Sequence, residues 1–154
     1  MPTRGDGVDV IARAKRAPQM HWQRRANDVA LEYDPGTGLY LYDIVVESVP
    51  RQSGKTKSEG DVADHRCLSR PRARVWITMQ NGKTVDSWMR SEHFASLAAA
   101  RAFGVPGTKT ARYEVSRRAG EVGVLWPALG SSFLTFPPKR DALHSKQSDL
   151  VMVD

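Results

Sequence analysis

Apolar and polar residues alternate along much of the chain, and this alternation predicts β-strands. Residues 28–33 and 39–49 alternate on either side of a connection rich in Gly and Pro, so they predict a β-hairpin. In the second arm, the even-numbered residues from Tyr40 to Val46 share one face of the strand. We expect this face, which is built from Tyr, Ile and Val, to lie in the core.

A second alternating stretch, residues 74–88, carries Asn81-Gly82 at its centre. Asn-Gly between alternating residues is a strong hairpin signal, because a type I′ turn requires positive φ at both central positions. The stretch therefore predicts a hairpin with one apolar face toward the core. The opposite face combines basic, aromatic and small polar side chains: Arg74, Trp76, Thr78, Gln80, Lys83, Val85 and Ser87.

The same stretch contains Gly82-Lys83-Thr84, the end of the sequence pattern of a phosphate-binding loop. The full pattern has another glycine five residues earlier, so that backbone amides can surround the phosphates. Ile77 occupies that position here, and Val49 occupies it for the second copy at Gly54-Lys55-Thr56. Nucleotide hydrolysis is therefore not expected.

Residues 91–104 predict the main helix. Their middle is rich in alanine, Ser91 suits the N-cap position, and Gly104 followed by Pro106 suits the end. The stretch from Arg74 through this helix resembles plant DNA-binding domains in which a small sheet enters the major groove and an alanine-rich helix supports it. An alternative is a bacterial helix-turn-helix over residues 97–114, but Pro106-Gly107 disfavours its second helix.

Three later stretches, residues 110–118, 121–126 and 131–136, also alternate as short strands. The order of elements predicts an α+β fold, with a mostly antiparallel sheet of about 5–7 short strands. One main helix, at about residues 91–104, is expected to pack on this sheet.

Other stretches have no apolar periodicity. They predict a basic mobile arm at 1–22, a long loop at 50–72 and a C-terminal tail at 138–154. One domain, residues 23–137, remains between the arm and the tail, which suits a chain of 154 residues.

Charge is unevenly distributed. The net charge is +6, yet residues 26–50 hold five acidic residues and no basic residue, so the positive charge flanks an acidic segment. A basic chain with segregated charge suits a polyanionic partner, because each neutralised phosphate releases condensed counterions. The single cysteine, Cys67, and the lack of a membrane-length apolar run predict an intracellular protein with no membrane partner.

Catalytic patterns are weak. The four histidines are far apart in the sequence, and no metal-ligand spacing is present. Asp64, His65 and Cys67 lie close together, but a flexible loop would not hold a thiol and its base in attacking geometry. We therefore expect a non-enzymatic protein with no metal and no cofactor.

The sequence predicts a small accessory or regulatory protein that binds DNA or RNA. A basic sheet face and a basic loop would contact phosphates while Trp76 stacks on a base, and the arm, with Lys15, would clamp the partner. The alternative is an inhibitor or adaptor that binds a protein partner through its charged surface. The expected nucleic-acid-binding residues are Arg66, Arg70, Arg72, Arg74, Trp76, Lys83, Arg112, Arg117 and Arg118.

Overall fold

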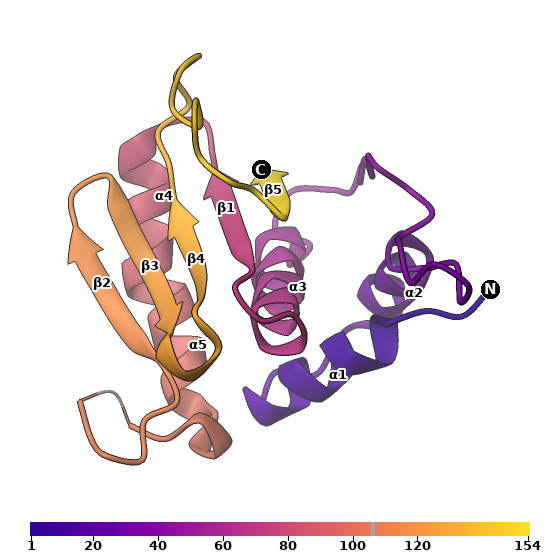
Figure 1. Ribbon diagram of the computed structural model, residues 1–154, viewed down its shortest axis with the longest axis horizontal. Helices are drawn as coiled ribbons and strands as arrows, with labels where there is room; N and C mark the ends of the chain where they lie inside the picture. The colour runs from indigo at the N-terminus through magenta and orange to yellow at the C-terminus, as the bar shows by residue number, and fades with distance from the viewer. Residues whose placement is uncertain (106) are drawn as a thin grey trace.

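The computed structural model describes residues 1–105 and 107–154, and it is an α+β fold built on a five-stranded mixed sheet (Figure 1). The strand order is β2-β3-β4-β1-β5. The strands are β1 (Arg74–Thr78), β2 (Glu114–Arg118), β3 (Glu121–Trp126), β4 (Ser131–Thr135) and β5 (Leu150–Val153). The helices are α1 (Gly5–Ala14), α2 (His21–Ala30), α3 (Lys55–Ser69), α4 (Gly82–Trp88) and α5 (Phe94–Ala99). A π turn, η1 (Met89–His93), joins α4 to α5, and η2 (Arg101–Phe103) and η3 (Pro127–Leu129) are short 3-10 turns.

The sheet is half parallel. Strands β2, β3 and β4 are antiparallel neighbours, whereas β1 lies parallel to both β4 and β5. The prediction of an α+β fold is confirmed, but the mostly antiparallel sheet and the single main helix are only partly matched. The parallel pairs arise because a helical connection follows β1 and because the C-terminal residues return to pair with β1.

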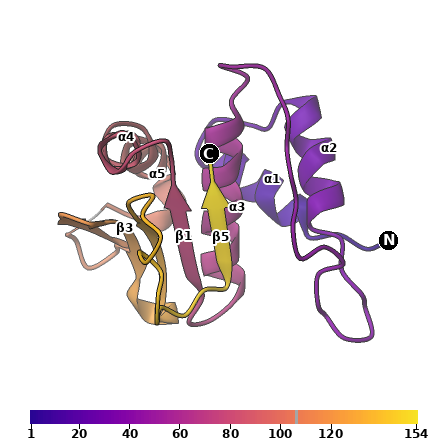
Figure 2. The ribbon, with the colours of Figure 1, turned by 90° about the horizontal axis from the view of Figure 1, so that it is seen from above.

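The run from α4 to α5 lies behind the strands in Figure 1, and α3, α1 and α2 follow to their right. α3 and the run from α4 to α5 lie against the strands, and α1 and α2 pack beyond α3 (Figures 1 and 2). The inward side chains of the central strands include Val75, Ile77, Val124 and Phe133, all with no exposed surface. This apolar layer fixes which face of each strand is internal.

The hairpin predicted at 74–88 is wrong. β1 ends at Thr78, and the chain enters α4 at Gly82. Asn81 is the N-cap of α4, and its side-chain oxygen accepts a hydrogen bond of 2.8 Å from the Thr84 amide. Buried Val85 and Trp88 have helical spacing, which outweighs the Asn-Gly turn signal.

The segment between β1 and α4 connects a strand to a helix, as a phosphate-binding loop also does. Ile77 nevertheless lies inside β1, so the pattern still lacks its first glycine. The new context therefore does not restore the nucleotide-binding interpretation. It also removes the likeness to plant DNA-binding domains, because the second strand of that arrangement is a helix here.

The main helix begins earlier than predicted. Helical structure runs from Gly82 through the π turn to Ala99, and Ser91 lies inside it, donating a hydrogen bond to the Ser87 carbonyl at 2.8 Å. Pro106, expected to help end the helix, lies outside the described residues. Residues 114–118 form β2, so the second helix of a helix-turn-helix is not formed there.

The long loop predicted at 50–72 is wrong for most of its length, because residues 55–69 form α3. Many of the residues that α3 buries are polar, including Ser58, Asp61 and Asp64, so the helix has little apolar periodicity. Gly60 allows close approach to the π turn, since a Cβ there would lie 2.9 Å from Nδ1 of His93.

Both chain ends are also packed into the domain. The residues assigned to a basic arm form α1, which buries Val8, Ile11 and Ala12, and residues 28–30 end α2 instead of forming a strand. The stretch assigned to a C-terminal tail ends in β5, which pairs with β1.

A buried ionic network joins α1, α3 and the π turn. The Lys15 ammonium lies 2.9 Å from Asp61 and also contacts Asp64, while Nε2 of His93 lies 3.3 Å from Asp64. Burial opposes charge on both Lys15 and Asp64. The two carboxylates nevertheless raise the pKa of Lys15, and Lys15 with His93 lowers the pKa of Asp64.

Replacing Asp64 by Asn should destabilise the protein strongly, because Lys15 would keep its charge in a buried site with one partner lost. We expect a loss of about 3–5 kcal/mol in the free energy of unfolding, measured by urea denaturation. Asp6→Asn is the matched control. It removes an exposed ion pair with Arg24 and should cost less than about 1 kcal/mol. Equal losses in the two variants would show that the network adds nothing beyond a surface pair.

Candidate functional site

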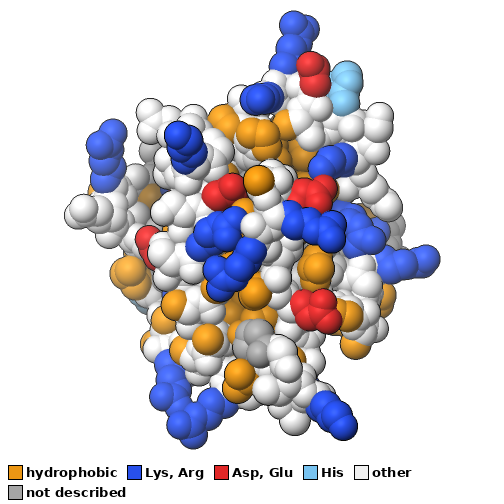
Figure 3. Space-filling view, turned by 90° about the vertical axis from the view of Figure 1, so that its left-hand side faces the viewer, with side chains coloured by type: hydrophobic (Ala, Val, Ile, Leu, Met, Phe, Trp, Pro, Cys, Tyr) orange, Lys and Arg blue, Asp and Glu red, His pale blue; other side chains and the backbone are white. Residues whose placement is uncertain are grey.

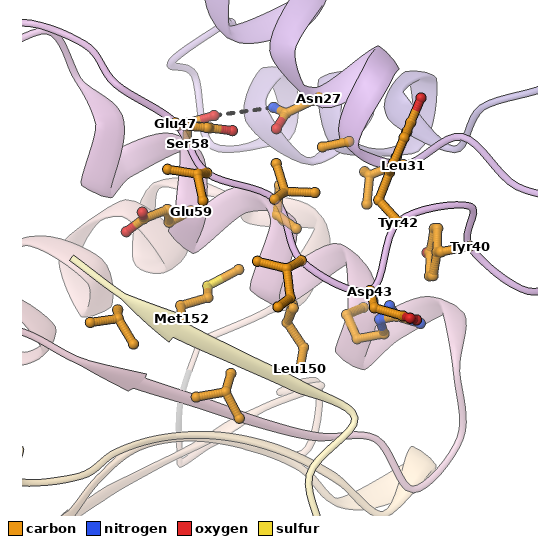
Figure 4. Close-up of a pocket in the computed structure, with 18 of the residues that line it drawn as sticks. Asn27, Leu31, Tyr40, Tyr42, Asp43, Glu47, Ser58, Glu59, Leu150 and Met152 are labelled. Carbon is orange, nitrogen blue, oxygen red and sulfur yellow. Dashed lines mark hydrogen bonds between the residues drawn. The ribbon is translucent and has the colours of Figure 1, made fainter.

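A cleft of about 480 Å³ lies beside β5. We call it the β5 cleft. Its walls are α2, α3, β5 and residues 40–47, which lie far apart in the sequence (Figure 4). Its volume is within the usual range for ligand pockets, roughly 300–1,000 Å³.

The α3 wall is a single stripe of the helix. Ser58, Val62 and Arg66 are four residues apart, so they follow one another along the same side. At the α2 side, Asn27 donates a hydrogen bond of 3.1 Å to the Ser58 hydroxyl (Figure 4). Val62 therefore supplies an apolar centre between two polar ends.

β5 supplies an open sheet edge. It pairs with β1 on one side, and the part of the chain that the structure describes provides no strand on its other side. Leu150 and Met152 point toward the inner layer, whereas Val151 and Val153 are 43% and 74% exposed. Unpaired backbone groups at such an edge are available to another extended chain.

Residues 41–47 form the facing wall and are extended but unpaired as a strand within the described structure. The segment is anchored at Tyr40, which bridges to Tyr33 and lies under the guanidinium of Arg66, 4.3 Å from the ring centre. Ile44 and Val46 are 82% and 86% exposed, so the prediction that this face lies in the core is wrong. Of the expected partner strand, residues 28–30 end α2, and Tyr33 keeps only the isolated antiparallel bridge to Tyr40. The free edge of the sheet, β5, lies across the cleft.

One end of the cleft is acidic. Glu47, Glu59 and the Asp154 carboxylate share one cation, Lys55, which contacts Asp154 and lies 3.9 Å from Glu59. Oε2 of Glu59 is buried and has no hydrogen-bond partner in the described structure. Burial, followed by the Asp154 and Glu47 charges, raises the pKa of Glu59 to about 7, against the opposing effect of Lys55.

The predicted basic residues near α3 are mostly engaged within the protein. Arg66 is buried over Tyr40, Arg70 pairs with Asp149 at 3.1 Å, and Arg74 donates to the Gly130 carbonyl. Arg72 is exposed. This group therefore offers fewer free cations than the sequence indicates.

Trp76 lies on the outer sheet face, as predicted, but it is only 5% exposed. Its indole N–H donates to the Gln147 carbonyl at 3.1 Å, and the Lys146 ammonium lies 4.5 Å from the ring centre. Residues between β4 and β5 thus cover the ring. A base could stack on Trp76 only if this segment moved away.

The remaining predicted residues lie elsewhere. Lys83 is exposed at the start of α4, and Arg112, Arg117 and Arg118 are exposed before and along β2. Two strands separate β2 from β1, a distance of about 14 Å between the outer two. Figure 3 shows Lys and Arg side chains close together on the face that carries the β2 edge, with acidic side chains among them. The nine residues do not form one continuous patch.

The residues considered for catalysis, Asp64, His65 and Cys67, all lie on α3. Cys67 is fully buried, and its burial raises the pKa of the thiol, which disfavours the thiolate that a nucleophile needs. Over residues 1–105 and 107–154, no group of three or more His, Cys, Asp or Glu side chains is arranged to hold a metal ion. The helices in these residues are too short or too polar to cross a bilayer.

The chain has no match among protein families, curated proteins or solved structures. The β5 cleft and the charged surface are therefore the features that bear on its function.

The β5 cleft cannot be recognised directly from the sequence. A signal was nevertheless present: residues 39–49 are strongly strand-like, but their charged members are all acidic, and a surface segment with this composition suits an interface. The other half of the site, Ser58 to Arg66, was hidden because α3 was predicted to be a loop.

Glu59 should make stability fall as pH rises. Its folded-state pKa is above the ordinary value of 4.5, so between about pH 4.5 and 7 the folded protein holds a proton that the unfolded chain has lost. Glu59→Gln removes this dependence. Relative to the wild type, the variant should gain up to about 3 kcal/mol between about pH 5 and pH 8, measured by denaturation at both pH values.

Glu92→Gln, at an exposed position of the π turn, is the control and should show no such gain. A constant difference between Glu59→Gln and wild type across this pH range would contradict the raised pKa.

Proposed function

We propose that the protein is a non-enzymatic adaptor or inhibitor that binds a partner protein by holding an extended segment of it in the β5 cleft. The observation that carries the proposal is that the open sheet edge of β5 borders an apolar cleft. The edge offers backbone hydrogen bonds, and the cleft offers positions for alternate side chains.

The geometry suits a strand better than a helix. β5 and residues 41–47 both run from the Arg66 end of α3 toward its Lys55 end, so two extended segments border the cleft. A strand added beside β5 would lie about 4.8 Å from it and would cover Val62. Its backbone would form hydrogen bonds with the free edge of β5, on the side away from β1.

The exposed apolar side chains support the same proposal. Ile44, Val46 and Val153 are each more than 70% exposed and lie around one opening. Clustered apolar side chains on a surface mark contact sites more often than do scattered ones. Burial of this cluster by a partner would contribute favourable free energy at roughly 25 cal/mol per Å² of apolar area.

Selection from a phage library of random linear dodecapeptides on the immobilised protein tests this proposal. Selected peptides should bind in solution by fluorescence anisotropy, and Val62→Trp, which fills the cleft, should weaken them at least tenfold, about 1.4 kcal/mol. Val10→Trp adds the same ring at an exposed site on α1 and should leave binding unchanged. Far-UV circular dichroism and thermal unfolding verify that both variants are folded.

Failure to select any peptide that Val62→Trp weakens more than Val10→Trp would overturn the proposal. The selection does not depend on a guess about the partner's sequence.

A second candidate function is nucleic-acid binding through the β2 edge. The observation that favours it is the exposure of Arg112, Arg117 and Arg118, next to Arg90, which donates to the Arg117 carbonyl at 2.8 Å. Glu121 is the acidic residue that β3 brings opposite Arg118. Together with a net charge of +6, these cations suit phosphate contacts without base stacking by Trp76.

This candidate predicts a steep, log-linear fall in affinity for a labelled single strand or duplex as salt increases. Arg118→Ala should lower the slope by about one unit. Arg13→Ala, which removes a cation paired with Asp9 on α1, should change it less. Absence of binding near physiological salt, about 0.15 M, would exclude a nucleic-acid function for this surface.

A further inference from the structure

The charges of the β5 cleft are separated along its length. Arg66 and Asp43 lie toward the end where α3 finishes (Figure 4), and Glu47, Lys55 and Glu59 lie at the end where α3 begins, with Asp154 on the Lys55 ammonium. Between them the walls are mostly apolar. An occupant of this cleft therefore meets different chemistry at its two ends.

The acidic end of the cleft holds more carboxyl groups than cations. Three carboxyl groups face one ammonium, and Asp154 already engages that ammonium while also accepting from the Thr56 hydroxyl. The side chain of Glu59 is only 18% exposed, and its Oε2 has no partner within the described structure. One further cation would complete the pairing of this group.

The elements around Glu59 bring one basic side chain between them. The 40–47 segment brings Glu47, α3 brings Lys55, the end of β5 brings Asp154, and α2 brings the neutral amide of Asn27. Among the described residues, the other basic side chain that lines the cleft is Arg66, two helical turns away along α3. A cation that pairs with Glu59 would therefore come from the occupant.

A second copy of this chain fits poorly. Its exposed apolar segment, residues 39–47, would be the natural strand to insert, but this segment carries Asp43 and Glu47 and no basic residue. Insertion would bring more carboxylates to a site that already has three. Charge complementarity thus favours a different protein.

We infer that the occupant of the β5 cleft is an extended, apolar segment of another protein with a Lys or Arg that pairs with Glu59. This inference rests on the proposed function, since it specifies the partner of the same cleft. Pairing with a cation lowers the pKa of Glu59, so binding near pH 7 is accompanied by release of a proton.

Parallel phage selections of the dodecapeptide library on wild type and on Glu59→Gln test this inference. Peptides selected on the wild type should be enriched in Lys or Arg at one position, and those selected on Glu59→Gln should not be. For the strongest wild-type peptide, made synthetically, replacing that basic residue by Gln should weaken binding about tenfold to wild type and little to Glu59→Gln. Glu92→Gln is the matched control and should behave as wild type.

Isothermal titration calorimetry in two buffers of different ionisation enthalpy gives an independent readout. The basic peptide should release a proton on binding to wild type near pH 7, and neither its Gln form nor the Glu59→Gln protein should show this release. Glu47→Gln provides a second variant that leaves Glu59 in place and should weaken the basic peptide less than Glu59→Gln does.

The outcomes separate the two proposals. Peptides that Val62→Trp weakens but that carry no basic preference would overturn this inference and leave the proposed function intact. No cleft-dependent peptide at all would overturn both. Dimerisation that Val62→Trp abolishes, measured by sedimentation, would assign the cleft to a second copy and overturn the inference of a foreign partner.

Discussion

Lys15 lies between the carboxylates of Asp61 and Asp64 with almost no access to water, and Asp64 is in turn joined to His93. Three elements, α1, α3 and the π turn, meet at this point, and Ile11, Ala63 and Met89 join them in one apolar core as well. A charge buried in this way is costly to leave unpaired, so each member constrains the positions of the others. The ion pairs therefore hold α1, α3 and the π turn in one arrangement.

The β5 cleft depends on that arrangement. Asp61 and Asp64 face α1 and the π turn, while Ser58, Val62 and Arg66 of the same helix face the cleft. Turning α3 about its axis to release the ion pairs would also move the stripe that forms the wall. The ion pairs thus fix the position of the β5 cleft wall although they do not line the cleft. Buried polar residues on one side of α3 determine where its cleft-facing residues lie.

Local signals in the sequence were sufficient for part of the fold. Residues 121–126 and 131–135 alternate as strands and are strands, since each buries one face on the helices. Residues 55–69 could not be recognised as a helix from apolar periodicity, because charged partners distant in the sequence satisfy its buried groups. Asn81-Gly82 misled for another reason: the same residues that favour a tight turn also cap a helix.

The candidate site was harder to predict because it is assembled from four distant segments. Residues 39–49 and 150–153 are both strand-like in sequence. Their sequences do not show that β5 pairs with β1 while residues 41–47 stay outside the sheet. The predicted role of the basic residues and Trp76 depends on their availability. That availability is set by contacts with Gln147, Asp149 and Gly130 that only the folded chain reveals.

Gly60 and His93 touch where α3 crosses the π turn, and no side chain larger than hydrogen fits at position 60 while the imidazole is in place. A larger residue 60 requires that the imidazole move or that residue 93 be smaller, and either change weakens the contact that His93 makes with Asp64. Positions 60 and 93 are therefore coupled, because the space taken by one side chain limits the size of the other.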